Sequence, residues 1–256
     1  MAYALITGAS TGIGRDLAKL CAGAGYDVLA VARNQAQLET LALEIRNTYR
    51  RQVNILVKDL SRPEAPAELF AAIADLHDPI EMLINNAGVG MLGFFAELDA
   101  AKQMEMLRLN VDALTSLTRL FVPSMIALHK GYVLNVASTA AFQPGPLMAV
   151  YYASKAYVVS FSSALHNELK SHGIVVTTLC PGPTLTEFQR RAQMEDTALF
   201  RRSVMDSTTV ARIGFDAMMR GKPLVVAGRL NGLMAFLTRF APRQMAASMA
   251  RRMQEA

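Results

Sequence analysis

The stretch YALITGASTGIG, residues 3–14, decides the fold, because it runs from an apolar strand pattern directly into a glycine-rich turn. Gly8, Gly12 and Gly14 allow a tight turn and let the backbone approach a pyrophosphate. A helix that begins here would present its N-terminal N–H groups to the phosphates. The spacing is G-x3-G-x-G rather than G-x-G-x-x-G, and such a turn can be purely structural. Its place on the first strand of an alternating pattern favours a dinucleotide site.

Apolar strand-like runs alternate with helical patterns along the rest of the chain, such as those over residues 13–23 and 35–49. Near-continuous Val, Ile and Leu runs between helices indicate a parallel sheet buried on both faces. Right-handed crossovers then predict a doubly wound, three-layer α/β fold with a mainly parallel sheet of about seven strands. The expected strands are 3–7, 27–32, 52–59, 81–86, 131–137, 173–180 and 223–228.

The composition fits one domain. The chain has 256 residues, of which 52% are apolar and 18% are charged, so a sizeable core is available. No linker or repeat divides it, and we expect a single domain over 1–256 with 229–256 as its C-terminal helical extension. Neither a signal-peptide pattern nor an apolar run of membrane-spanning length is evident, so we expect a cytoplasmic protein.

The positive charge is concentrated in the last residues. Of the net charge of +5, the tail 229–256 carries +4, from five arginines and Glu255. A nearly neutral main body argues against a nucleic-acid partner. The arginines stand at positions 229, 239, 243, 251 and 252.

The cysteines and histidines do not suggest a metal site. Cys21 and Cys180 lie far apart and outside any CxxC spacing, so we interpret both as core residues. The four histidines have no ligand-like partners nearby in the sequence, and we expect no metal. They are His77, His129, His166 and His172.

The end of the second strand predicts which nicotinamide cofactor is preferred. An NAD site usually has an acidic residue here for the ribose 2′-hydroxyl, whereas an arginine suits a 2′-phosphate. Ala32 supplies no carboxylate and Arg33 can supply a charge-assisted fork, so NADP(H) is favoured. Arg33 could also be an ordinary exposed arginine. Asp59, after the third strand, can accept a hydrogen bond from the adenine amino group or cap the next segment.

Further motifs follow the glycine turn in a fixed order: NNAG at 85–88, Asn110, Ser138, YYASK at 151–155 and PGPTLT at 181–186. With TGASTGIG, they make the sequence resemble the short-chain dehydrogenase/reductase family over nearly its whole length. A ketoreductase-like bacterial group within the family is the most similar. The resemblance implies a Rossmann-like fold, a nicotinamide cofactor and a Tyr-Lys-Ser-Asn active site.

Four positions match the family's catalytic residues: Tyr151, Lys155, Ser138 and Asn110. The resemblance implies that Tyr151 is the general acid/base in hydride transfer between NADP(H) and a carbonyl or alcohol. A free tyrosine has a pKa near ~10, and a positive Lys155 is expected to lower it. Ser138 would orient the substrate oxygen, and Asn110 would hold a water that relays protons.

The resemblance also implies a set of cofactor contacts. One departure is Thr11, where many NADP-preferring members have a basic residue. The expected contacts are Gly8, Ser10, Thr11, Gly12, Ile13, Gly14, Arg33, Asp59, Leu60, Asn86, Ala87, Gly88, Tyr151, Lys155, Pro181, Gly182, Thr184 and Thr186.

Helical spacing alone does not decide which tyrosine reacts. Tyr151 and Tyr152 are four and three residues before Lys155, and both positions share a helix face with it. They lie about 100° apart around the axis, so only one is expected to face Ser138. The family spacing selects Tyr151. Tyr152 is then a core or substrate-wall residue, and Tyr157 a packing residue.

Three other functions remain open at this point: a nucleotide-sensing protein without catalysis, an epimerase or dehydratase with a similar Tyr-Lys pair, and a membrane-surface role for the tail. The filled catalytic positions argue against the first, and the glycine spacing argues against the second.

The expected substrate is a small hydrophobic carbonyl or alcohol. Segment 185–205 is expected to cover the pocket and to become less mobile when cofactor binds, with Met91, Leu92, Phe94 and Phe95 adding an apolar wall.

The tail has apolar residues at helical spacing on both sides of Pro242. We expect it to pack on the domain or on another subunit, in a homodimer or homotetramer, and to cover the substrate side or a subunit interface. Contact with an anionic membrane is the less favoured alternative.

Overall fold

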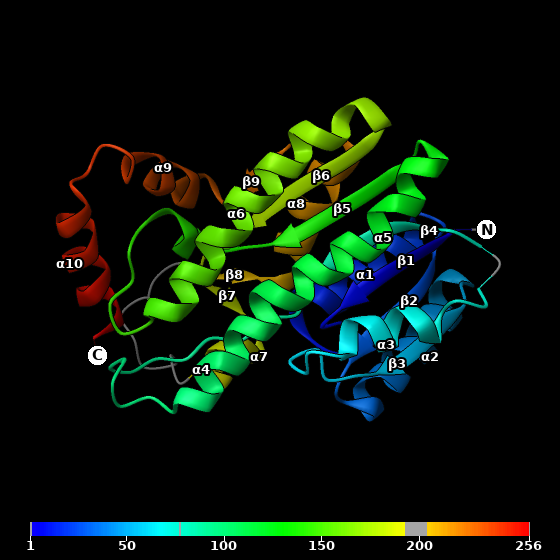
Figure 1. Cartoon of the computed structure of the whole chain (residues 1–256), viewed down its shortest axis with the longest axis horizontal. Helices are drawn as coiled ribbons and strands as arrows, with labels where there is room; N and C mark the ends of the chain where they lie inside the picture. Colours follow the sequence, from blue (N-terminus) through cyan, green and yellow to red (C-terminus); the bar gives the residue numbers. More distant parts are fainter. Residues whose placement is uncertain (1, 77, 193–203, 256) are drawn as a thin grey trace.

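The computed structural model describes residues 2–76, 78–192 and 204–255, and its centre is a seven-stranded parallel sheet (Figure 1). The strand order is β3-β2-β1-β4-β5-β6-β9. This confirms the expected doubly wound fold, and each expected strand is found within two residues of its predicted bounds. The strands are β1 (Tyr3–Thr7), β2 (Asp27–Ala32), β3 (Val53–Val57), β4 (Ile80–Asn85), β5 (Gly131–Val136), β6 (Ile174–Cys180) and β9 (Leu224–Val226).

Helices cover both faces of the sheet because successive strand residues point to opposite sides. Ala4 and Ile6 of β1 face one core cluster, which α1, α2 and α8 close. Leu5 faces the other, which α3, α5 and α6 close. Both faces of the sheet are therefore buried, which confirms the prediction from the uninterrupted apolar strands. These helices are α1 (Gly12–Gly23), α2 (Gln35–Tyr49), α3 (Ala65–Ala72), α5 (Leu114–Leu128), α6 (Ala149–Leu169) and α8 (Ser207–Met219).

A continuous helical stretch runs from Ala100 to Leu128, through α4 (Ala100–Leu107), a π-helical turn (Arg108–Ala113) and α5. By length and composition it could cross a membrane, which corrects the expectation that no segment reaches that length. Leu117, Phe121 and Met125 are buried in the core beside the sheet. We therefore interpret it as a helix of the domain.

Several short elements lie at the carboxyl edge of the sheet. A second, two-stranded sheet pairs β7 (Thr184–Leu185) with β8 (Met205–Asp206), and neither strand was expected. Figure 1 shows α9 and α10 beyond the arrowheads of β5 and β6. The remaining short helices are 3-10 turns at Thr139–Phe142 and Lys170–His172, α7 (Glu187–Arg191), α9 (Arg229–Leu237) and α10 (Arg243–Gln254).

Candidate active site

The glycine turn between β1 and α1 is closely packed. Gly8 and Gly12 have φ of +67° and +55°, in the left-handed region that favours glycine. A Cβ on Gly12 would lie 2.8 Å from Cγ2 of Thr186. A Cβ on Gly14 would lie 2.3 Å from both the Gly8 carbonyl oxygen and Nδ2 of Asn86. The absence of a side chain at Gly14 thus lets the start of α1 pack closely against the turn. The turn places backbone N–H groups at the carboxyl edge of the sheet.

Asn86 fastens this turn to the end of β4. Its Nδ2 donates to the carbonyl oxygens of Thr7 at 3.0 Å and Gly8 at 3.2 Å. The Thr7 hydroxyl in turn accepts from the backbone N–H groups of Asn86 and Ala87, each at 3.0 Å. Thr7 was not among the expected site residues. Its position as the last residue of β1 is the signal that could have indicated it.

The three candidate reacting side chains meet at the carboxyl end of β5. Ser138 begins the 3-10 turn after β5, and Tyr151 and Lys155 lie one turn apart on α6. The side chain of Ser138 lies close to that of Tyr151, where hydrogen bonding between them acts to lower the tyrosine pKa. Lys155 Nζ lies 5.9 Å from the centroid of the Tyr151 ring and donates to the Val136 carbonyl oxygen at 2.9 Å. The lysine therefore ties α6 to β5.

Burial dominates the pKa values of this pair. It raises the pKa of Tyr151 to about 12, although the hydrogen bond with Ser138 opposes the rise. It lowers the pKa of Lys155 to about 8. The expectation that Lys155 lowers the pKa of Tyr151 is therefore wrong for the protein by itself. Removing both groups from water disfavours the charged form of each, and this is the largest influence on both pKa values.

Asn110 sits in the π-helical turn and acts as a structural clamp. Its Oδ1 accepts from the Val89 N–H at 3.0 Å, and its Nδ2 donates to the Val89 carbonyl at 2.9 Å. Nδ2 also donates to the Ser154 hydroxyl at 3.1 Å, which donates to the Tyr151 carbonyl at 2.7 Å. The side chain thus links the strand-β4 loop to the catalytic helix. Its expected role in holding a water stays a prediction.

A cavity of about 500 Å³ opens between the glycine turn and these side chains. The positive-φ glycines and the Thr7–Asn86 bonds leave the turn's backbone at its wall, which fits the pyrophosphate of a nicotinamide cofactor. Of the expected residues, those lining the cavity are Gly8, Ser10, Thr11, Gly12, Ile13, Asn86, Ala87, Gly88, Ser138, Tyr151, Lys155, Pro181, Gly182, Thr184 and Thr186.

Five expected site residues lie outside the cavity lining: Gly14, Asn110, Arg33, Asp59 and Leu60. The side chain of Leu60 is buried in the core, so its expected cofactor contact would come from its backbone and stays a prediction. Arg33 Nη1 lies 3.6 Å from Asp59 Oδ2 at the exposed end of β2. Burial would raise the pKa of Asp59, but hydrogen bonds from Ser61 and the charge of Arg33 outweigh it, and the pKa is lowered.

The two neighbouring tyrosines have different surroundings. The Tyr152 hydroxyl accepts a 2.7 Å hydrogen bond from Nε2 of Gln254, and its ring lines the cavity. Tyr157 stacks on Phe161 with ring centroids 5.6 Å apart, which confirms a packing role. The ring of Phe188 lies 5.5 Å from that of Tyr151. Of the two tyrosines, Tyr151 is therefore the one that interacts with Ser138, whereas Tyr152 bonds to the tail.

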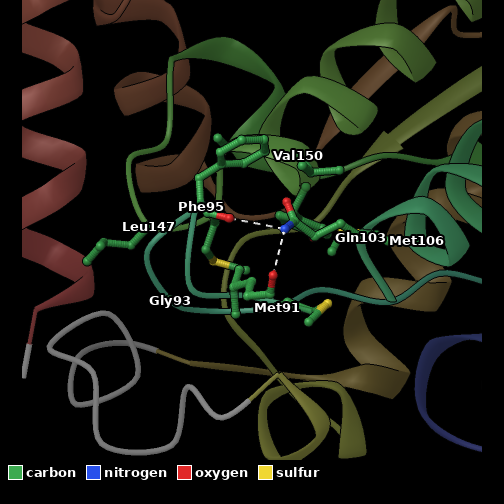
Figure 2. Close-up of a pocket in the computed structure, with 11 residues that line it drawn as sticks. Met91, Gly93, Phe95, Gln103, Met106, Leu147 and Val150 are labelled. Atoms are coloured by element: carbon green, nitrogen blue, oxygen red, sulfur yellow. Dashed lines mark hydrogen bonds between the residues drawn. The ribbon is translucent and has the colours of Figure 1, made fainter. Parts of the chain in front are cut away.

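The expected apolar wall is only partly formed by the loop after β4. Figure 2 shows Met91 and Phe95 around a second cavity of about 20 Å³, beside Tyr151. Gln103 holds this loop by donating to the carbonyl oxygens of Phe95 at 3.1 Å and Leu98 at 3.2 Å. Phe94 is exposed and does not line the larger cavity.

The rest of the cavity wall comes from the tail and from the segment that begins at Thr184. The tail lines the larger cavity through side chains such as Met234 and Met249, in line with the expectation that it covers the substrate side. Positions 193–203 of the expected covering segment lie outside the described residues. Among the described residues, no group of three or more metal-ligating side chains gathers.

Solved structures with the same fold include dehydrogenases. A short-chain dehydrogenase from Sphingobium yanoikuyae in complex with NADPH is 29% identical, with a TM-score of 0.83, and the match covers 97% of this chain and 100% of that one. A bulky-bulky ketone specific alcohol dehydrogenase from Comamonas testosteroni is 27% identical, with a TM-score of 0.78, covering 97% and 98%.

Curated relatives are longer proteins. A very-long-chain 3-oxoacyl-CoA reductase from Anas platyrhynchos is 34% identical over 74% of this chain, which is 62% of its own length. An inactive hydroxysteroid dehydrogenase-like protein 1 from Homo sapiens is 32% identical over 70% of this chain and 54% of its own length. The family model for short chain dehydrogenases matches residues 2–197. The chain therefore belongs to the short-chain dehydrogenase family.

Proposed function

We propose that this protein transfers a hydride between NADP(H) and a hydrophobic carbonyl or alcohol substrate. One observation carries the proposal. Ser138, Tyr151 and Lys155 lie together at the wall of the same cavity that the glycine turn lines. Cofactor and substrate would therefore meet beside a tyrosine that can exchange a proton.

Each side chain has a role in that reaction. A bound nicotinamide would supply the hydride chemistry. Tyr151 donates its phenolic proton to the carbonyl oxygen as negative charge develops there. Ser138 donates a hydrogen bond to the same oxygen, which orients the substrate and stabilises the charge. Lys155, fixed on the Val136 carbonyl, keeps a positive charge near the phenolate that remains.

NADP(H) is favoured over NAD(H) by the end of β2. Ala32 offers no carboxylate to a ribose 2′-hydroxyl, and the exposed Arg33 guanidinium pairs with Asp59, which also accepts hydrogen bonds from Ser61. Such a guanidinium can turn to a 2′-phosphate at the cost of a weak 3.6 Å pair. The complex of the Sphingobium protein with NADPH supports this preference.

A hydrophobic carbonyl substrate is supported by the rest of the cavity wall. Met148, Phe188, Met234 and Met249 line it beyond the catalytic side chains. The names of two relatives specify a bulky ketone and a 3-oxoacyl thioester, which both contain a carbonyl group.

The test is NADPH and NADH oxidation against ketones, aldehydes, steroids and acyl thioesters. Tyr151→Phe is the inactive control, and Tyr157→Phe, a change in a packing tyrosine, is the matched active one. Oxidation of NADPH that depends on Tyr151 would support the proposal. Tight NADPH binding without turnover of any compound would favour the nucleotide-sensing alternative, in line with the relative named as inactive.

We also propose a cytoplasmic homo-oligomer, with residues 1–256 as one domain. The oligomer proposal is supported by the Ala100–Leu128 helical stretch, because only 33% of its most hydropathic 18-residue window is buried. Met104 and Leu128 are exposed on it. Exposed apolar helix faces of this kind pair readily with a second copy.

A further inference from the structure

The tail helices expose more apolar surface than any other stretch of similar length that the structure describes. Phe240 is 72% exposed and Leu230 is 65% exposed. Soluble monomeric proteins rarely expose so many neighbouring apolar side chains. The exposed apolar residues are Leu230, Leu233, Met234, Phe236, Leu237, Phe240, Met245, Met249 and Met253.

The two helices each have an inner and an outer side. In α9, the exposed residues Leu230, Leu233 and Phe236 recur at intervals of three and do not line the cavity, so they share one outer face. Ala235, which is buried, lies on the opposite side. These three exposed residues therefore form an apolar strip that faces away from the domain, whereas Met234, Leu237, Met249 and Met253 line the large cavity.

The inner side of α10 carries Ala246, Ala250 and Gln254, all buried. Met249 and Met253 lie beside this stripe, exposed and also lining the large cavity. Apolar side chains of the tail thus lie both on its outer side and at the wall of the cavity.

The charge around the strip has one sign. All five tail arginines are exposed, and the only acidic residue among them, Glu255, already pairs with Arg251 at 2.7 Å. No ion pair of Arg229, Arg239 or Arg243 is recorded within residues 2–76, 78–192 and 204–255. An apolar strip edged by unneutralised cations is complementary to the hydrocarbon boundary and anionic headgroups of a lipid bilayer.

A second copy of the chain is a poorer occupant. In a two-fold dimer the same patch meets itself, so the arginines of one tail would face those of the other. The tail offers no spare carboxylate to separate them. The expected preference for a subunit contact at the tail is therefore reversed by the arrangement of its charges.

We infer that α9 and α10 lie on an anionic membrane surface with the cavity rim at the interface. If the proposed function holds, an apolar substrate dissolved in the bilayer would enter the cavity from the lipid. The membrane contact itself does not depend on that function.

Vesicle sedimentation of the full chain tests the contact. We expect binding to vesicles of phosphatidylcholine with phosphatidylglycerol, little binding to phosphatidylcholine alone, and weakening by salt. Arg239→Glu with Arg243→Glu should weaken binding at least about tenfold. Leu233→Gln with Phe236→Gln should do the same by removing buried apolar contact.

Matched controls are Arg119→Glu on α5 and Leu43→Gln on α2, which are exposed far from the tail in sequence and should leave binding unchanged. Oxidation of NADPH by a water-soluble ketone should also stay unchanged in the Leu233/Phe236 variant, because neither residue lines the cavity. Absence of NADPH oxidation in the unmodified protein, with binding to anionic vesicles retained, would count against the reductase and not against the membrane contact.

Two results would overturn the inference. One is absence of binding to anionic vesicles by the unmodified protein. The other is a change in oligomer size, measured by light scattering, when Leu233 and Phe236 are replaced, because this would assign the strip to a second copy.

Discussion

Gln254, in the last turn of α10, donates a 2.7 Å hydrogen bond to the hydroxyl of Tyr152, a residue 102 positions earlier and next to the proposed acid. Both residues are buried. The bond fixes the end of the tail against the first turn of α6. It therefore connects the position of the tail to the catalytic helix.

Gln254→Ala should loosen the tail, because the Tyr152 hydroxyl would lose its recorded partner at a cost of about 1–2 kcal/mol. Faster hydrogen exchange over α9 and α10 is the expected signal. Gln244→Ala, an exposed position on the same helix, is the control. Tyr152→Phe should act like Gln254→Ala, and the double variant should add little. Additive effects would show that the bond does not hold the tail.

Tyr151→Phe should lower kcat by about 10²–10⁴, since it removes the proton donor, while NADPH binding measured by fluorescence is retained. Tyr152→Phe should keep substantial activity, because its hydroxyl bonds to Gln254 and not to Ser138. The assignment is wrong if Tyr152→Phe is the inactive variant and Tyr151→Phe the active one.

Arg33→Asp should shift preference from NADPH toward NADH. The change removes a cation that can pair with a 2′-phosphate and adds a repelling charge beside Asp59. We expect KM for NADPH to rise about tenfold or more while KM for NADH changes less. Arg119→Asp controls for net charge. Equal efficiencies with the two cofactors in the unmodified protein would remove the basis of this prediction.

Lys155 should make folding stability depend on pH. Burial lowers its pKa in the folded state to about 8, below its ordinary value, so the unfolded chain binds the extra proton between the two values. Stability relative to Lys155→Met should therefore rise with pH, by about 2 kcal/mol between pH ~7.5 and ~9.5. Urea unfolding at both pH values measures it. If the stability relative to Lys155→Met stays constant or falls as pH rises over this range, burial does not lower the pKa of the Lys155 amine in the folded state.

Gly145→Ala should destabilise the loop before α6. An added Cβ would lie 2.2 Å from the Tyr152 ring, and displacing a packed ring costs about 1–3 kcal/mol. Gly232→Ala in α9 is the matched control, because nothing lies within 4 Å of its added Cβ. That change should stabilise the helix by up to about 1 kcal/mol. Equal midpoints of unfolding for the two variants would contradict this account.

The sheet was predictable because each buried strand needs an apolar run of its own, and seven such runs were visible. The pair β7–β8 was not, since two residues per strand give no periodicity. The π-helical turn was also missed, because the segment around Asn110 has the same apolar pattern as an ordinary helix.

The candidate site was predictable where a motif is local and not where contacts come from far along the chain. The fixed order of motifs located Ser138, Tyr151 and Lys155. The bond from Gln254 to Tyr152, and the clamp from Asn110 to Val89, depend on tertiary packing that spacing does not encode. The pKa of Tyr151 was misjudged for the same reason, since burial is set by the whole fold.

The strand order has a consequence for biosynthesis. β1 pairs with β2 and β4, so the first strand to leave the ribosome keeps one edge open until Ile80 to Asn85 have followed. Parallel pairing across so long a separation is slow, and an open apolar strand edge invites association between nascent chains. The N-terminal third should therefore need protection by chaperones during translation, and a protein truncated before β4 should aggregate rather than accumulate as a folded fragment.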